Sequence, residues 1–232
     1  MNRINARASF IKHWYKTIMK HIRNIIWDFN GTLLDDLDLC LEIINVLLER
    51  RGIKPLSRER YLEIFTFPVR DYYLAAGMNF RSEPFEAVAK EYMDIYLSRV
   101  CSIPLHAGTA GILNRFRENG FEQIILSAME QEELLRVVHC NGIEEYFRQI
   151  FGISNHLGGG KLELTQTVMQ VTGFDPATTC LIGDTLHDME VARKAGIRCI
   201  LIANGHQSEK RLAETGLPVA GDIRELPSLF GL

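Results

Sequence analysis

Short apolar runs alternate with amphipathic stretches of helical period along the second half of the chain. A run such as residues 198–202, RCILI, is short and lies between turn-forming residues, which is typical of a buried strand. The stretches between such runs place apolar residues three and four positions apart, as on one face of a helix. This alternation predicts an α/β fold with a parallel sheet flanked by helices. The expected strands are 25–27, 122–127, 149–153, 179–182, 198–202 and 218–220, and the expected helices are 109–119, 130–140 and 161–172.

The pattern between residues 36 and 100 is different, because no stretch there reads as a strand. Helices are expected from residue 37, begun by Asp35 or Asp36, and then from 57, 68 and 85. Ser102-Ile103-Pro104 ends the last of them. We therefore expect an all-α domain at residues 36–103, inserted into an α/β core of residues 24–35 and 104–232.

Composition agrees with a soluble globular protein that has a sizeable core, because 47% of the 232 residues are hydrophobic. The five cysteines show no metal-ligand spacing, and we expect buried free thiols in a reducing compartment. No apolar run approaches the roughly 20 residues that span a bilayer, and no signal peptide is evident. The sequence predicts a cytoplasmic protein that does not bind membranes, and it leaves monomer and homodimer open.

The net charge of −3 hides an asymmetry. Residues 1–24 carry six of the 26 basic residues and no acidic one, so the remainder has a net charge of −9. Binding of nucleic acid by the folded body is not expected. We interpret residues 1–23 as a basic extension and Met19 as a possible true start. The alternative is a helix that binds a membrane surface or a partner.

Two of the predicted strands end in carboxylates. Asp28 follows the first strand, Asp184 follows strand 179–182, and Asp188 comes four residues later. Ligands of open α/β sheets bind at the carboxyl ends of the strands, where these side chains would meet. Three crowded carboxylates repel one another unless a cation lies among them, and oxygen ligands suit Mg²⁺. The sequence therefore predicts a divalent metal site.

Four motifs resemble, in their order along the chain, those of the haloacid dehalogenase superfamily. They are Asp28-Phe29-Asn30-Gly31-Thr32, Ser127 after an apolar run, Lys161, and Gly183-Asp184-Thr185-Leu186-His187-Asp188. The helical stretch after the first motif is similar to the cap domain of the phosphoglycolate phosphatase and β-phosphoglucomutase-like branch. The resemblance implies a Rossmann-like core with a helical cap, and a phosphatase that acts on a small phosphorylated metabolite.

The resemblance also implies roles for individual residues. Asp28 would attack phosphorus and form an aspartyl-phosphate, which water then hydrolyses. Mg²⁺ would be held by Asp28, Asp184, Asp188 and the main-chain carbonyl of Asn30. The residues expected to bind substrate are Ser127 and Lys161, on the phosphoryl oxygens, Gly31 and Thr32 in the first motif, and Arg70 in the cap.

One position departs from the family pattern, since phosphatases of this family usually carry Asp where this chain has Asn30. An amide cannot protonate a departing alkoxide, and such acid catalysis contributes roughly 10²–10⁴-fold in rate. We expect reduced activity on alkyl phosphates and faster reaction of aryl or acyl phosphates. The alternatives are a weakly active or inactive phosphate-binding regulatory protein, and a phosphonatase-like hydrolase, which would need a cap lysine such as Lys54 or Lys90.

Overall fold

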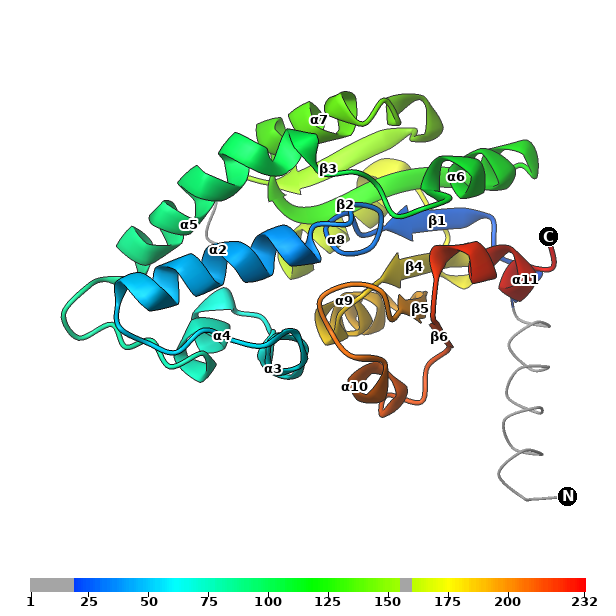
Figure 1. The fold of residues 1–232 in the computed structure, drawn as a ribbon. Coiled ribbons are helices and arrows are strands. Elements are labelled where there is room, and N and C mark those ends of the chain that lie inside the picture. The colour runs from blue at the N-terminus through cyan, green and yellow to red at the C-terminus, as the bar shows by residue number, and fades with distance from the viewer. Residues whose placement is uncertain (1–18, 155–159) are drawn as a thin grey trace, which may run out of the picture.

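The computed structural model describes residues 19–154 and 160–232, and the predicted basic extension lies almost wholly outside them. Six parallel strands form one sheet in the order β3-β2-β1-β4-β5-β6 (Figure 1). The order reverses beside β1, which is where open α/β sheets form their ligand sites. The strands are β1 (Asn24–Trp27), β2 (Glu122–Glu130), β3 (Gln149–Ile153), β4 (Thr179–Gly183), β5 (Arg198–Ile202) and β6 (Val219–Ala220).

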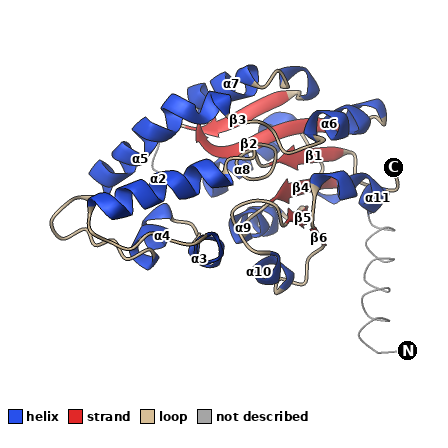
Figure 2. Cartoon of the chain, in the orientation of Figure 1, coloured by secondary structure: helices blue, strands red, loops and turns tan. Residues whose placement is uncertain are grey.

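Alternate residues of each strand face opposite sides of the sheet and belong to two separate apolar clusters. In β1, Ile25 and Trp27 belong to one cluster, whereas Ile26 belongs to the other. Both faces are therefore buried, as continuous apolar strands require. Helices cover both faces, giving three layers (Figure 2).

The helices of the two layers follow the strands in the chain. The first cluster contains side chains of α6 (Thr109–Glu118), α7 (Gln131–Cys140) and α11 (Leu226–Phe230). The second contains side chains of α8 (Lys161–Thr172), α9 (Leu186–Ala195) and α10 (Glu209–Ala213). The predicted α/β fold with a parallel sheet is confirmed.

Four helices occupy the chain between β1 and α6, and no strand lies among them, as predicted. We call them the helical insertion. The carboxyl ends of the strands point toward it (Figure 1). Its first helix begins after Asp36, but the Asp36 side chain does not cap it and makes other contacts, described below. The four are α2 (Leu37–Arg50), α3 (Arg58–Ile64), α4 (Val69–Ala75) and α5 (Phe85–Arg99).

The cysteines differ from the sequence prediction. Cys40, Cys180 and Cys199 are buried free thiols, but Cys101 and Cys140 form a disulfide. The two come together because the 3₁₀ turn Val100–Ser102, at the end of the insertion, packs on α7. No helix of the described residues is both long and apolar enough to span a bilayer.

Candidate active site

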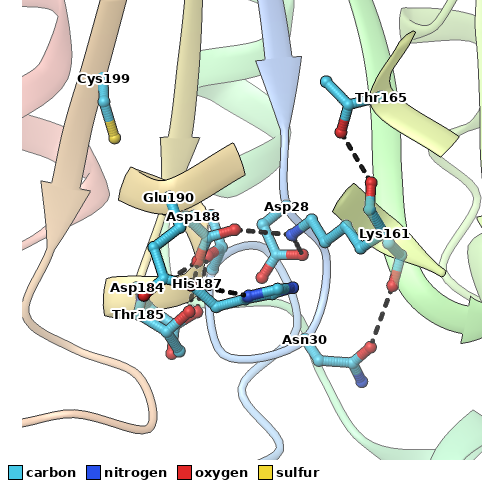
Figure 3. Close-up of polar contacts among 12 residues, drawn as sticks. Asp28, Asn30, Lys161, Thr165, Asp184, Thr185, His187, Asp188, Glu190 and Cys199 are labelled. Atoms are coloured by element: carbon cyan, nitrogen blue, oxygen red, sulfur yellow. Dashed lines mark hydrogen bonds and ion pairs between the residues drawn. The ribbon is translucent and has the colours of Figure 1, made fainter. Parts of the chain in front are cut away.

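Three carboxylates meet at the carboxyl end of the sheet. Asp28 follows β1 and Asp184 follows β4, and these strands are neighbours with Trp27 paired to Ile182. Asp188 comes from the first turn of α9. Carboxylate oxygens of the three lie within 4.8 Å of one another (Figure 3). The structure thus brings together the acidic residues that the sequence placed at two strand ends.

Lys161 lies among these acids. It is the first residue of α8, it is 3% exposed, and its Nζ donates to Oδ1 of Asp28 and Oδ1 of Asp188, both at 2.6 Å. Burial disfavours the charged lysine, but Asp188 and Asp28 outweigh burial and raise the pKa of Lys161. The ammonium group is therefore retained as a fixed positive charge at the site.

The carboxylates remain electrostatically crowded even with Lys161 present. Burial, with the charges of Asp188 and Asp184, raises the pKa of Asp28 well above its usual value. Burial is also the main cause that raises the pKa of Asp184. For Asp188, burial is outweighed by Lys161, and its pKa is lowered. One ammonium group thus does not neutralise three acids, and a further cation would favour their charged forms.

The orientation of the acids fits a metal ion with oxygen ligands. Oδ1 of Asp184 accepts from the Thr32 hydroxyl at 3.1 Å, and Oδ2 accepts from the His206 main-chain N–H at 2.6 Å. Oδ2 of Asp188 accepts from Thr185 N at 3.0 Å and from its hydroxyl at 2.7 Å. Hydrogen bonds of this kind orient metal ligands. The donor set fits Mg²⁺.

A second buried cluster adjoins the first and is centred on Asp36. The side-chain nitrogen of Asn30 donates to Oδ2 of Asp36 at 2.9 Å and to the Tyr96 hydroxyl at 2.6 Å. Tyr96 donates to the same carboxylate at 2.6 Å, and His206 Nε2 lies 3.2 Å from its Oδ1. His206 Nδ1 lies 2.9 Å from the Tyr61 hydroxyl. Asp36 thus has a partner for each of its oxygens.

Asp36 and His206 form a buried ion pair. Burial would raise the pKa of Asp36, but the charge of His206 and the bonds from His206, Tyr96 and Asn30 lower it to about 2. Burial would lower the pKa of His206, but the charge of Asp36 raises it to about 9. Asp36 is a carboxylate and can only accept, so the atom of Asn30 that faces it is the amide nitrogen.

Ser127 lies on the other side of Asn30. Its hydroxyl is 3.4 Å from Oδ1 of Asn30 and accepts from Met129 N at 3.0 Å. The residue occurs within β2, which runs three residues beyond its predicted end. Asn30 therefore turns its amide nitrogen toward Asp36 and its carbonyl oxygen toward Ser127.

The remaining predicted substrate residues are placed differently from one another. The Gly31 N–H donates to Oδ1 of Asp36 at 2.9 Å, and a Cβ on Gly31 would lie 2.5 Å from Oδ2 of Asp184. The Thr32 hydroxyl donates to Oδ1 of Asp184, as noted above. Arg70 does not line the cavity of the site, because α4 turns Val69 and Tyr72 toward it. The Arg70 guanidinium lies outside, 5.7 Å from the centre of the Phe80 ring.

A cavity of about 180 Å³ joins the two clusters to the helical insertion. His187 lines it with its ring centre 4.9 Å from that of Phe67. Asp36, Cys40 and His206 also lie within 4.8 Å of one another. They do not fit a metal site well, because Asp36 and His206 are hydrogen-bonded and burial raises the pKa of Cys40.

Sequence reasoning missed His206, Tyr61 and Tyr96, and it assigned Asp36 only to a helix start. The one available signal was the Asp35-Asp36 pair, in which the second acid follows Asn30 by six residues. His206 lies after β5, and the tyrosines come from α3 and α5. Only the packing of these elements shows that they meet.

Comparison with known proteins gives a consistent result. The family model of haloacid dehalogenase-like hydrolases matches residues 25–202. A phosphoglycolate phosphatase of Synechococcus elongatus is 23% identical over 190 residues, which cover 81% of this chain and 87% of the relative. An N-acetylmuramic acid 6-phosphate phosphatase of Pseudomonas aeruginosa is 23% identical, covering 80% and 83%.

Solved structures agree on the fold. A haloacid dehalogenase-like hydrolase from Streptococcus pneumoniae superimposes with a TM-score of 0.78 at 18% identity, covering 90% of this chain and 99% of that one. A structure described as a predicted phosphoglycolate phosphatase from Haemophilus somnus gives a TM-score of 0.72 at 15% identity, covering 90% and 98%.

Proposed function

Because the chain belongs to the haloacid dehalogenase-like hydrolase family, we propose that it is a Mg²⁺-dependent phosphatase of a small phosphorylated metabolite, acting through an aspartyl-phosphate on Asp28. The observation that carries the proposal is the cluster of Asp28, Asp184 and Asp188 around Lys161 at the carboxyl end of the sheet. Relatives that are phosphoglycolate and N-acetylmuramic acid 6-phosphate phosphatases support the reaction class.

Asp28 would be the nucleophile. Lys161 donates a hydrogen bond to Oδ1 of Asp28. Within the described residues, Oδ2 of Asp28 makes no hydrogen bond, so it remains available for attack. A bond forms between this oxygen and phosphorus, and the ester bond to the leaving group breaks. Water then attacks the aspartyl-phosphate and releases phosphate.

Charge is the main obstacle to this attack, because a carboxylate and a phosphate dianion repel each other. The residues that would hold Mg²⁺ are Asp28, Asp184, Asp188 and the Asn30 main-chain carbonyl. The ion, when bound, would supply positive charge that offsets the repulsion. Lys161 and Ser127 would donate to phosphoryl oxygens, which stabilises the charge that develops during transfer.

Asn30 limits the leaving groups that this site can release. Both hydrogens of its amide nitrogen are used, one by Asp36 and one by Tyr96, so the side chain offers only its carbonyl oxygen to the substrate. The site therefore lacks an acid at the position where relatives carry one. The site is therefore suited to substrates whose leaving groups depart without protonation.

A phosphate-release assay tests the proposal. Purified protein is expected to hydrolyse phenyl phosphate with Mg²⁺ and to lose at least 10³-fold of that activity in Asp28→Asn, because an amide is not a nucleophile at phosphorus. The control is Asp38→Asn, whose side chain is 83% exposed in α2 and should leave turnover unchanged. Retained turnover in folded Asp28→Asn would refute the assignment.

A non-enzymatic phosphate-binding protein is the second candidate, and the engaged amide of Asn30 favours it. It predicts that phosphate binds with Mg²⁺ while no ester is turned over. The phosphonatase-like alternative finds less support, because Lys54 is exposed and Lys90 pairs with Asp94 at 2.7 Å on the surface. Neither lysine lines the cavity.

A further inference from the structure

The wall of the cavity that faces Asp28 is aromatic. The helical insertion supplies it from three places: Phe67 before α4, Tyr72 in α4, and Phe85 and Tyr92 in α5. The Phe67 ring also contacts His187, which neighbours Asp188, so the aromatic wall reaches the acidic site. A substrate whose phosphate lies at Asp28 must place its organic part against these rings.

The same wall lacks a cation for a substrate carboxylate. Lys161 is the only lysine or arginine among the described residues that line the cavity, and Asp28 and Asp188 already engage it. Of the two histidines, His206 is engaged by Asp36 and Tyr61. His187 Nδ1 lies 3.6 Å from a carboxylate oxygen of Glu190, so this ring already has an acidic neighbour. A buried, unpaired carboxylate is costly, so phosphoglycolate is a poor match.

Tyr72 contributes its ring, and not its hydroxyl, to this wall. Its side chain is 2% exposed and packs against the rings of Tyr61, Phe65 and Tyr73. Its hydroxyl oxygen is itself buried, so it offers no surface to a ligand. The wall is therefore an apolar surface at this position.

The cavity has room for a single aromatic ring. Its volume is about 180 Å³, and a cavity of roughly 150 Å³ holds benzene. We propose that the substrate is the phosphate monoester of a single aromatic ring. This inference rests on the proposed function and defines the substrate class of the same site.

The chemistry of such a substrate suits Asn30. When Oδ2 of Asp28 bonds to phosphorus, the bond between phosphorus and the aryl oxygen breaks, and the phenolate leaves with the bonding electrons. It takes its proton from water, so no acid on the protein is needed. Hydrolysis of the aspartyl-phosphate then restores Asp28.

The first measurement separates ring binding from leaving-group reactivity. Benzyl and ethyl phosphate are both alkyl esters, and only benzyl phosphate has a ring. We expect kcat/KM for benzyl phosphate to exceed that for ethyl phosphate by roughly 10- to 100-fold, the effect of burying one aromatic group. Phosphoglycolate should be no better than ethyl phosphate, and phenyl phosphate should be the best of the four.

Two variants test the wall itself. Phe67→Ala should lower kcat/KM for benzyl phosphate about 10-fold and leave ethyl phosphate nearly unchanged. Leu74→Ala, on the exposed side of α4, is the control and should change neither.

The results distinguish this inference from the proposed function. Asp28-dependent hydrolysis that favours phosphoglycolate, or that treats benzyl and ethyl phosphate alike, would overturn the aromatic substrate and leave the phosphatase intact. Absence of Asp28-dependent phosphate release from every ester would overturn both proposals.

Discussion

At the scale of single residues, Asn30 has no carboxyl group of its own, but it is hydrogen-bonded to one, that of Asp36. The Asp36 carboxylate lies 2.9 Å from the Asn30 amide nitrogen, inside the same buried cluster. Asn30 departs from the family pattern in the sequence, and reduced acid catalysis could be predicted from its amide alone. Its orientation could not, because that depends on Asp36, Tyr96 and the charge on His206.

Restoring an acid at position 30 should therefore require a second change. Asn30→Asp alone places two carboxyl groups in hydrogen-bond contact in a buried site, and we expect it to lower the free energy of unfolding by about 1–3 kcal/mol. In the double variant Asn30→Asp with Asp36→Asn, the donor and acceptor are exchanged and the contact is kept.

The double variant gives up the Asp36 charge that pairs with His206, but it should gain roughly 10²-fold in kcat on benzyl phosphate, with a smaller gain on phenyl phosphate. Denaturant unfolding and steady-state kinetics of the three proteins measure both effects. Equal gains on the two esters would show that proton donation is not what Asn30 lacks.

The His206–Asp36 pair gives a second prediction at this scale. Burial would lower the pKa of His206, but Asp36 raises it from 6.5 to about 9, so the charged ring stabilises the folded state. That contribution is complete below pH 6.5 and is lost as the pH rises through about 9. The His206→Gln variant lacks this contribution at every pH.

The wild type should therefore exceed His206→Gln in unfolding free energy by a few kcal/mol near pH 6, and by much less near pH 10. Urea unfolding across this range measures the difference. The exposed His21→Gln is the control and should follow the wild type. A difference that stays constant with pH would contradict the ion pair.

At the scale of elements, the carboxyl ends of β1 and β4 could be predicted because an apolar run followed directly by Asp marks both. The helices of the insertion were also predictable from their period. The loop after β5 carried no such signal, although it holds Asp184 through the His206 N–H. Tyr61 and Tyr96 looked like ordinary core positions, since only tertiary packing directs their hydroxyls to the site.

The loop after β5 yields a prediction about the metal site. A Cβ on Gly205 would lie 2.1 Å from Oδ2 of Asp184 and 2.5 Å from the Gly31 carbonyl oxygen. Gly205→Ala must displace Asp184, and we expect it to weaken Mg²⁺ binding at least 10-fold. Gly111→Ala, in α6 with no atom within 4 Å of the added carbon, is the matched control. Isothermal titration with Mg²⁺ measures both, and equal affinities would exclude this role of the loop.

At the scale of the whole molecule, the core and the helical insertion contribute different parts of one cavity. The core supplies the acids, from the ends of β1 and β4 and from α9, and it supplies Lys161 from α8. The insertion supplies the aromatic wall and Tyr96. The fold and the cluster of acids around Lys161 could thus be predicted from motifs in the core. Arg70, the arginine expected to contact substrate, does not line the cavity, and helical period alone did not show which side of α4 faces the core.

The central claim is that Asp28 accepts the phosphoryl group. Mass spectrometry of protein mixed with phenyl phosphate and Mg²⁺, then quenched in acid, tests it most directly. The account predicts that the wild type gains one phosphoryl group on the peptide that contains Asp28, and that Asp28→Asn gains none. A wild type that releases phosphate without a phosphorylated Asp28, or that carries the group on another residue, would contradict the account.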